Sequence, residues 1–350
     1  MFDRRSPKCP PWAGLSVIGL LIVTCIGGCV APTPKSETSL NRAEQLGLQN
    51  RALELLLRAA LNDDPFVTCN AIEALVEIAP RDGRIAFRRA IRAADPLVRY
   101  AGFVALGELR DCELAAEATK GVQDPQPNVR LAAAFYAYRC GREGAARVLV
   151  RALTEAPQES VRADAASLIG RLEEPRAVMW LRRAARRGAN LRSTRVLLQI
   201  HGALAQLGDE DGLQQLVVYS HGDTAARIEA LLILAQLDHQ QARDDLLYAL
   251  LGPDEDYLEA RLVAARALGK LGYRDGFALA LESLAYVDPN PNPTPDDPDQ
   301  TFAVRSLAAH ALAEMRDPRA LPVLRELAAD PSDARLQVAA SYAICKILGP

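Results

Sequence analysis

A short motif that returns at a nearly constant interval is the feature that most constrains this chain. It is a Val-Arg-type pair followed, six residues after the arginine, by Ala-Leu-Gly-x-Leu, and it is clearest at Val98-Arg99 and Ala260-Arg261. The arginine position recurs at residues 68, 99, 130, 162, 197, 227, 261, 305 and 335. The successive intervals are 31, 31, 32, 35, 30, 34, 44 and 30 residues. Such a fixed interval is typical of an array in which each unit is one supersecondary element.

Each unit predicts two helices. Apolar residues make up 49 % of the chain but aromatics only 5 %, so alanine and leucine, the strongest helix formers, must supply the core. Asp-Pro pairs that begin at residues 64, 95, 124 and 330 are expected to start first helices, because Asp caps and Pro suits the first turn. Asp82-Gly83, Asp275-Gly276 and Asp317-Pro318 are expected before second helices. Glycines in the last turn of three first helices should let neighbouring helices approach closely: Gly107, Gly170 and Gly269.

The repeat resembles the HEAT repeat, in the short bacterial form also found in phycobilisome-lyase-like proteins. The resemblance implies an all-α fold, an α-solenoid of about nine stacked two-helix units curved into a right-handed superhelix over residues 45–350. It also implies an Asp/Arg ladder between units, which should be interrupted at Arg130, Leu197 and Arg227, where the pattern weakens. With helices 8–10 Å apart, nine units predict a curved rod about 80–90 Å long.

The two ends of this rod are expected to differ. Residues 46–61 should form one unpaired helix that closes the start. The last unit has only its first helix, so the C-terminal half-repeat is a possible surface for a partner or for self-association.

The N-terminal segment is typical of an export signal. Arg4, Arg5 and Lys8 precede an apolar run over residues 15–26, and small residues lead to Cys29. Residues 26–29 resemble a bacterial lipobox, which implies a signal peptide over 1–28, lipidation of Cys29 and a flexible tether over 29–44. The alternative is an uncleaved transmembrane anchor, since no charge occurs between Lys8 and Lys35. Both alternatives predict a membrane-anchored protein of the cell envelope, on the periplasmic side.

The cysteines of the body leave two alternatives open. Cys112 and Cys140 would lie near the turns of adjacent repeats, where an oxidising compartment could join them. The other alternative, which the sequence favours, is that Cys69, Cys112, Cys140 and Cys345 are separate buried thiols. No Cys/His spacing suited to zinc occurs.

Two local features depart from the repeat pattern: a proline-rich segment and an arginine-rich stretch. The 44-residue interval contains an acidic, proline-rich segment at 288–300, expected to be an exposed loop and a possible contact arm. An arginine-rich stretch includes Arg182, Arg183, Arg186 and Arg187, whose i, i+4 spacing would place two pairs on one side of a helix. One interpretation is that these arginines lie on solvated helix faces. The other is that they form a patch that binds an anionic partner.

The resemblance implies that second helices line the concave face of the solenoid. Aromatic residues on such helices are then candidate anchors for a partner, although core packing explains them as well: Tyr219, Tyr248 and Tyr286. A net charge of −3 argues against nucleic acid, which needs a clustered basic surface.

The function expected from these features is an envelope-tethered protein–protein interaction scaffold without catalytic activity, with no cofactor. None of the four histidines precedes a glutamate, so the ligand pairs of the HEAT-repeat hydroxylases are missing. Two alternatives stay open: a lyase-like protein that handles a chromophore or cofactor, and a module that binds an anionic envelope polymer or lipid.

Overall fold

All nine repeat anchors lie on α-helices. The structure is a computed structural model that describes residues 40–222, 224–237, 240–252, 258–290, 292–294 and 299–349. The helices that carry the anchors are α2 (Pro65–Ile78), α4 (Pro96–Glu108), α6 (Pro127–Arg139), α8 (Glu159–Gly170), α11 (Thr194–Gln206), α13 (Thr224–Leu234), α15 (Leu258–Lys270), α17 (Thr301–Met315) and α19 (Ala334–Leu348). The described residues contain no β-strand, so the all-α solenoid prediction is confirmed.

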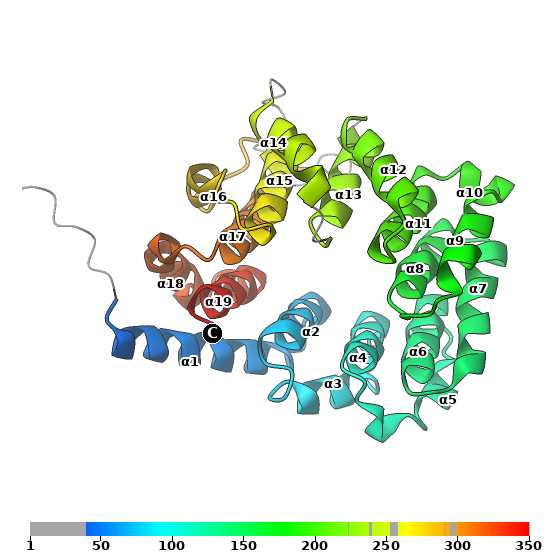
Figure 1. Cartoon of the computed structure of the whole chain (residues 1–350). Coiled ribbons are helices and arrows are strands. Elements are labelled where there is room, and N and C mark those ends of the chain that lie inside the picture. The colour runs from blue at the N-terminus through cyan, green and yellow to red at the C-terminus, as the bar shows by residue number, and fades with distance from the viewer. Residues whose placement is uncertain are drawn as a thin grey trace, which may run out of the picture. The chain divides into compact units, whose positions relative to one another are not determined.

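Shorter helices follow the anchor helices from α2 to α17 and form a second layer outside them (Figure 1). They are α3 (Arg84–Ala90), α5 (Ala118–Gly121), α7 (Ala146–Glu155), α9 (Ala177–Ala185), α10 (Gly188–Leu191), α12 (Glu210–Ser220), α14 (Arg243–Leu251), α16 (Phe277–Ser283) and α18 (Leu321–Ala329). Short 3-10 turns occur at Cys112–Leu114, Glu143–Ala145, Gln240–Ala242 and Pro318–Ala320. Helix α1 (Arg42–Ala59) precedes the first pair. We call the anchor helices the inner helices and the others the outer helices.

The predicted aspartate caps are present at two of the four Asp-Pro pairs. Asp64 accepts a hydrogen bond from the Phe66 amide at 2.8 Å, and Asp95 accepts one from the Leu97 amide at 2.8 Å. At the other two pairs the helix begins later, at Pro127 and Ala334. There the helix starts are capped differently, because Pro127 takes the first-turn position of α6 and Asp333 caps α19.

The repeated arginine has a shared structural role. Its guanidinium donates to backbone carbonyls at the end of the preceding outer helix: Arg162 Nη1 to Ala156 at 2.9 Å, and Arg261 Nε to Leu250 at 2.9 Å. Arg130 donates likewise to the carbonyl of Asp124 at 2.7 Å. A positive charge at a helix C-terminus satisfies orphan carbonyls and complements the helix dipole.

The expected Asp/Arg ladder is therefore mostly an arginine-to-carbonyl arrangement. An aspartate completes the link at Arg99, which binds the carboxylate of Asp124 through Nε at 2.8 Å. The expected interruption at Arg130 is wrong, because a carbonyl needs no particular side chain and Arg130 keeps the contact.

Glycines bring inner helices together, as predicted. A Cβ on Gly170 would lie 2.7 Å from the Cβ of Ala203 on α11, and one on Gly107 would lie 2.6 Å from the Phe135 ring on α6. Non-bonded contacts of a Cβ atom are essentially never this short, so any side chain at these positions would push the helices apart.

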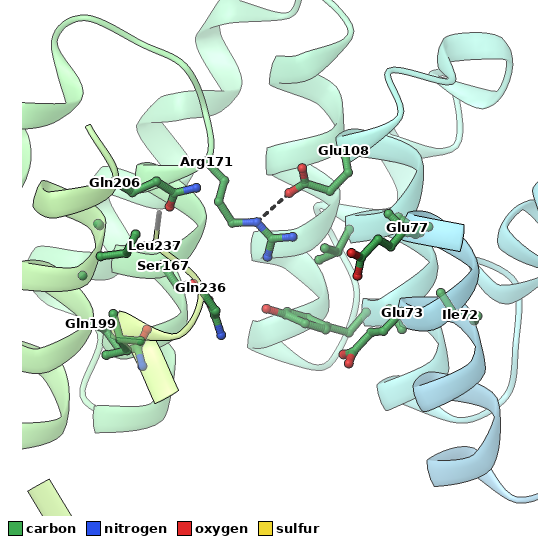
Figure 2. A pocket seen from close by; sticks show the side chains of 18 of the residues that line it. Ile72, Glu73, Glu77, Glu108, Ser167, Arg171, Gln199, Gln206, Gln236 and Leu237 are labelled. Atoms are coloured by element: carbon green, nitrogen blue, oxygen red, sulfur yellow. Dashed lines mark ion pairs between the residues drawn. The ribbon is translucent and has the colours of Figure 1, made fainter. Parts of the chain in front are cut away.

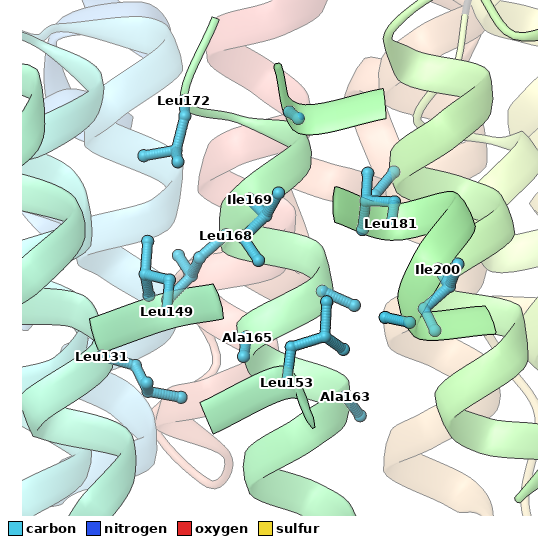
Figure 3. Close-up of a cluster of buried hydrophobic side chains, with 14 of the residues drawn as sticks. Leu131, Leu149, Leu153, Ala163, Ala165, Leu168, Ile169, Leu172, Leu181 and Ile200 are labelled. Carbon is cyan, nitrogen blue, oxygen red and sulfur yellow. The ribbon is translucent and has the colours of Figure 1, made fainter. Parts of the chain in front are cut away.

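The core between the layers is aliphatic. Leu149 and Leu153 of α7, Leu168 of α8 and Leu181 of α9 are fully buried in one cluster (Figure 3). Truncating one such leucine to alanine typically costs about 2–5 kcal/mol of stability. Each repeat therefore depends on its neighbours for burial, as in other solenoids.

The inner helices close on themselves. Each packs against the next from α2 to α19, and α19 then packs against both α1 and α2 (Figure 1). Residues 41–350 are one compact unit. The expectation of a curved rod that ends in a half-repeat without a neighbour is wrong, because α19 finds its missing partners at the start of the same chain. Helix α1 is likewise not unpaired, since it covers α19 with buried Leu48, Ala52 and Leu56.

A disulfide joins two of the four body cysteines. Cys112 and Cys140 are bonded across 28 positions, with their Cα atoms 5.5 Å apart, whereas Cys69 and Cys345 are free thiols. The sequence favoured four separate thiols, and for this pair that prediction is wrong. The turn at Cys112 and the end of α6 lie close enough for the bond.

Several sequence predictions fall outside the described residues. These are the signal peptide, Cys29, most of the tether, and residues 291 and 295–298 of the proline-rich loop. The described part of that loop includes Asp288, whose carboxylate accepts from the Gln300 amide at 2.6 Å. Among the described helices, none is long and apolar enough to cross a bilayer.

Candidate functional site

The inner helices enclose a cavity of about 480 Å³. It is lined by α2, α4, α8, α11 and α15 together with residues at and after the end of α13. A second cavity of about 260 Å³ lies between α2, α15, α17 and α19, and both are lined by Glu73, Glu77 and Arg266. We treat the two as one site, the inner cavity. The expectation that second helices line the concave face is wrong, because the first helix of each repeat does so.

Two opposite walls of the larger cavity differ in chemistry (Figure 2). One wall carries carboxylates from α2 and α4: Glu73, Glu77 and Glu108. The other carries amides from α11 and the end of α13: Gln199, Gln206 and Gln236. A molecule between these walls would meet hydrogen-bond acceptors on one side and groups that both donate and accept on the other.

Arg171 lies between the two walls. Its Nε is 2.5 Å from Glu108 Oε1, and its guanidinium lies 5.8 Å from the centre of the Phe135 ring. The ion pair neutralises Glu108 within the cavity, and the ring and the carboxylate together hold the arginine in place.

Glu73 has no such direct partner. Its carboxyl faces the cavity, and the structure gives it no hydrogen bond or ion pair within the described residues. Burial raises the pKa of Glu73, because the surrounding protein disfavours the charged form, while the positive charges of Arg171 and Arg266 lower it. Glu73 is therefore a carboxyl that a ligand could neutralise or hydrogen-bond.

Two further polar groups of the cavity lack partners in the described chain. The Nε atom of Arg266 is buried without a hydrogen bond. The hydroxyl of Tyr100 likewise makes none, and burial raises its pKa, so it stays a neutral phenol. Nε of Arg266 is buried, whereas Glu73 is exposed and Tyr100 is half-buried. Because buried polar groups are normally paired, this nitrogen beside two accessible groups indicates a place where a ligand can bind.

The smaller cavity is bordered by a polar network and by His310, whose buried Nδ1 has no hydrogen-bond partner in the described chain. The Tyr342 hydroxyl of α19 donates to Glu77 at 2.8 Å and lies 3.3 Å from a carboxylate oxygen of Glu314, and Lys346 pairs with both carboxylates. His310 lies beside Tyr342, with ring centroids 5.1 Å apart. Burial lowers the pKa of His310 to about 3, with a smaller contribution from the positive charge of Arg266, so the imidazole is neutral.

The predicted arginines lie elsewhere, on the outer layer. Arg182 pairs with Asp209 through Nη2 at 2.7 Å, whereas Arg183, Arg186 and Arg187 are exposed. The expected pairs along one helix are only partly formed, because α9 ends at Ala185 and Arg187 lies in the turn before α10.

The three candidate tyrosines do not come together. Tyr219 is partly buried beside His201, with ring centroids 6.4 Å apart. Tyr248 is 49 % exposed and lies near His221, whose Nε2 is 2.9 Å from Asp245. Tyr286 is partly buried near the proline-rich loop. None of the three lines the inner cavity.

The cavity residues share a signal in the sequence that none of the predictions used. The ninth residue after each anchor is polar in eight of nine repeats, although the helix around it is apolar. It is the variable residue of Ala-Leu-Gly-x-Leu, and it supplies Glu77, Glu108, Arg171, Gln206 and Gln236 to the cavity. A polar residue at a fixed place in an apolar repeat indicates a common face.

Nucleophilic and metal chemistry receives little support from the described residues. Burial is the main cause that raises the pKa of Cys69 to about 11 and that of Cys345 to about 12, so both stay protonated thiols. Within the described ranges, no three His, Cys, Asp or Glu side chains come together as metal ligands.

Comparison with known proteins supports the repeat assignment. Residues 86–168 and 296–345 match the family model of HEAT repeats. No curated protein matches the chain. Similar solved structures share 16–18 % identity with it, so these likenesses concern the fold alone.

Three of these structures cover most of the chain. YibA of Escherichia coli is 18 % identical over 89 % of this chain and 99 % of its own, with a TM-score of 0.34. The CpcE–CpcF complex of phycocyanin lyase from Nostoc is 18 % identical over 73 % and 91 %, with a TM-score of 0.39. Human deoxyhypusine hydroxylase in complex with glycerol is 16 % identical over 86 % and 98 %, with a TM-score of 0.36.

The comparison with these structures corrects one expectation from the sequence. The sequence led us to exclude an enzyme, but two of the structures with this fold are a lyase and a hydroxylase. The exclusion is therefore wrong, since an α-solenoid is compatible with catalysis. The family match and the helical pairs agree on a coarser conclusion: this is a helical protein with HEAT repeats at residues 86–168 and 296–345.

Proposed function

We propose that this protein is an interaction scaffold that binds a short, extended segment of a partner protein in the inner cavity. The observation that carries the proposal is the set of polar groups that line this cavity without partners in the described chain: the Glu73 carboxyl, the Tyr100 hydroxyl and Nε of Arg266. A bound molecule that paired with Nε of Arg266 would remove the cost of leaving this buried group unsatisfied, and Glu73 and Tyr100 are accessible for further hydrogen bonds.

The chemistry of the walls suits a polypeptide. The side-chain amides of Gln206 and Gln236 can each donate to a backbone carbonyl and accept from a backbone amide. Glu73 on the opposite wall can bind a basic side chain or a backbone amide. A cavity of about 480 Å³ has room for a short segment rather than a domain. Concave solenoid surfaces commonly bind in this way.

Site-specific crosslinking in the native envelope tests the proposal. A photo-crosslinking residue at Gln206 faces the cavity, and one at Val148 on α7 faces outward as the matched control. We expect an adduct from position 206 alone, which mass spectrometry maps to one segment of one polypeptide. The double variant Glu73→Ala/Gln236→Ala should lose this adduct while its circular dichroism stays unchanged.

Three results would oppose the proposal. Equal adducts from positions 206 and 148 would show that the cavity has no special role. The absence of any adduct from position 206 would show that no partner segment binds in the cavity. A pigment or small molecule that co-purifies with the wild-type protein and is lost in Glu73→Ala/Gln236→Ala would assign the cavity to that ligand instead.

We further propose that the scaffold is tethered to the cell envelope through lipidated Cys29. The support is the charged, apolar and small-residue order of residues 1–29. The Cys112–Cys140 disulfide is in keeping with an exported protein, because such bonds persist in oxidising compartments.

Mass spectrometry of the mature N-terminus tests the tether. We expect a chain that begins at an acylated Cys29, and a Cys29→Ser variant that is no longer processed there. A mature chain that keeps residues 1–28 and lacks acylation would support the uncleaved anchor instead.

A further inference from the structure

The outer face of α9 and α10 has an unusual combination of unpaired positive charge and exposed apolar side chains. Met179, Arg183 and Arg186 are spaced so that they share the side of α9 opposite to buried Ala177, Leu181 and Ala184. Exposed Arg187, Leu191 and Arg192 follow in the adjoining turn and α10. We call these six outward-facing residues the α9–α10 surface.

The four arginines of this surface are not neutralised by neighbours. Within the described residues, Arg183, Arg186, Arg187 and Arg192 have no ion pair or side-chain hydrogen bond. The arginine beside them, Arg182, differs because it contacts Asp209 and Asp211. On α3, by contrast, Arg84 and Arg88 both bind Asp111, although exposed Arg89 of that helix has no ion pair among the described residues.

The apolar members are exposed to an extent that needs an explanation. Met179 is 61 % exposed and Leu191 is 58 % exposed, on either side of the arginines. Long apolar side chains among cationic ones are the composition with which a protein surface enters the headgroup region of an anionic bilayer. An anionic polymer without apolar groups would satisfy the arginines but would leave Met179 and Leu191 in water.

We infer that the α9–α10 surface docks on a membrane rich in anionic lipid. The arginines would bind lipid phosphates, while Met179 and Leu191 would insert at the level of the headgroups. This surface is separate from the inner cavity, so the inference goes beyond the proposed scaffold function and does not depend on it.

The tryptophans of the chain provide a local readout. There are two, Trp12 and Trp180, and Trp180 lies on α9 next to Met179. The full chain with Trp12→Phe and Cys29→Ser therefore reports from α9 alone, even if the N-terminal segment binds the same vesicle. Vesicles would carry brominated phosphatidylglycerol or brominated phosphatidylcholine, which quench tryptophan on close approach.

We expect quenching of Trp180 by the anionic vesicles and not by the zwitterionic ones, with a loss of at least about tenfold in apparent affinity when salt is raised. Arg183→Glu/Arg186→Glu should abolish the quenching. The matched control, Arg89→Glu/Arg325→Glu on α3 and α18, changes the net charge equally at two other exposed sites and should leave it unchanged.

Any of three outcomes would overturn the inference. They are quenching by both kinds of vesicle alike, no quenching by either, and equal loss in the test and control variants. The last would mean that net charge, rather than this surface, attracts the chain.

Discussion

The hydroxyl of Tyr342, on the last inner helix, donates a hydrogen bond to Oε2 of Glu77, on the first, at 2.8 Å across 265 positions of the chain. The same carboxylate pairs with Lys346 one turn further along α19. Together with the apolar contacts of α1, these bonds join the end of the repeat array to its beginning.

Loss of the Glu77 carboxylate should weaken this junction. Since Glu77 is partly exposed and Glu314 also serves Tyr342 and Lys346, we expect Glu77→Ala to lower the free energy of unfolding by only about 1 kcal/mol. Hydrogen exchange should show faster opening in α1 and α19 than in α8. Glu54→Ala, at an exposed position of α1, is the control and should change neither quantity. Faster exchange spread evenly over all helices would argue against a local junction.

Close helix approach at Gly170 predicts a cost for the smallest side chain. A Cβ there would lie 2.7 Å from the Cβ and 2.8 Å from the Cα of Ala203, so α8 and α11 would have to separate. We expect Gly170→Ala to destabilise the protein by about 1–3 kcal/mol in urea unfolding.

Gly144→Ala is the matched control for this change, because nothing lies within 4 Å of the added methyl group. Its free energy of unfolding should stay within about 0.5 kcal/mol of wild type. If both variants were equally stable, the short distance at Gly170 would not be a real constraint on packing.

The Cys112–Cys140 bond should contribute to stability by restricting the unfolded chain. A loop of 28 residues corresponds to roughly 3–4 kcal/mol in the chain-entropy model, so reduction should lower the midpoint of thermal unfolding. Cys112→Ala/Cys140→Ala should have a similarly low midpoint that no longer responds to the reductant. Thiol titration of the unfolded wild type before and after reduction should differ by two groups, and no difference would mean that the bond is absent.

Buried His310 makes stability depend on pH. Its pKa falls from 6.5 to about 3 in the folded protein, so the unfolded chain takes up the proton first as the pH decreases. The contribution of the neutral imidazole is complete above pH 6.5 and is lost as the pH falls from 6.5 toward 3, by about 1 kcal/mol per unit.

The check is the difference between wild type and His310→Asn in urea unfolding at pH 7.5 and 5.5. Carboxyls such as Glu73 titrate in both proteins and largely cancel in this comparison. We expect wild type to lose about 1 kcal/mol more than the variant over this range. Parallel losses would show that His310 is protonated as easily when folded as when unfolded.

The sequence predicted the helical array because its determinants are local. The Asp64 and Asp95 caps act on amides two or three residues away, and the glycines meet the next unit of the same repeat. A constant interval of about thirty residues makes both features recognisable in the sequence. The bounds of individual helices were less predictable. Asp124 and Asp330 precede a proline as a cap would, but the helices begin a few residues later, at Pro127 and Ala334.

Closure and the cavity could not be predicted in the same way. Whether α19 meets α1 depends on the sum of small rotations between successive repeats, which no single residue determines. The partner-binding prediction was therefore directed to Tyr219 and Tyr248 on outer helices and to Tyr286, which lies just after α16. The polar ninth position, which includes Glu108 and Arg171, was visible in the sequence but gains meaning only once the inner helices are known to face one another.

The contact of α19 with α1 and α2 restricts how the number of repeats in this protein can evolve. An open array can gain or lose a unit at either end, because the remaining pairs keep their neighbours. Here the duplication or deletion of one helical pair would leave a gap or a collision at Tyr342 and Glu77. The number of units is thus fixed by geometry, and variation is confined to substitutions and to insertions between units, such as the segment after α16.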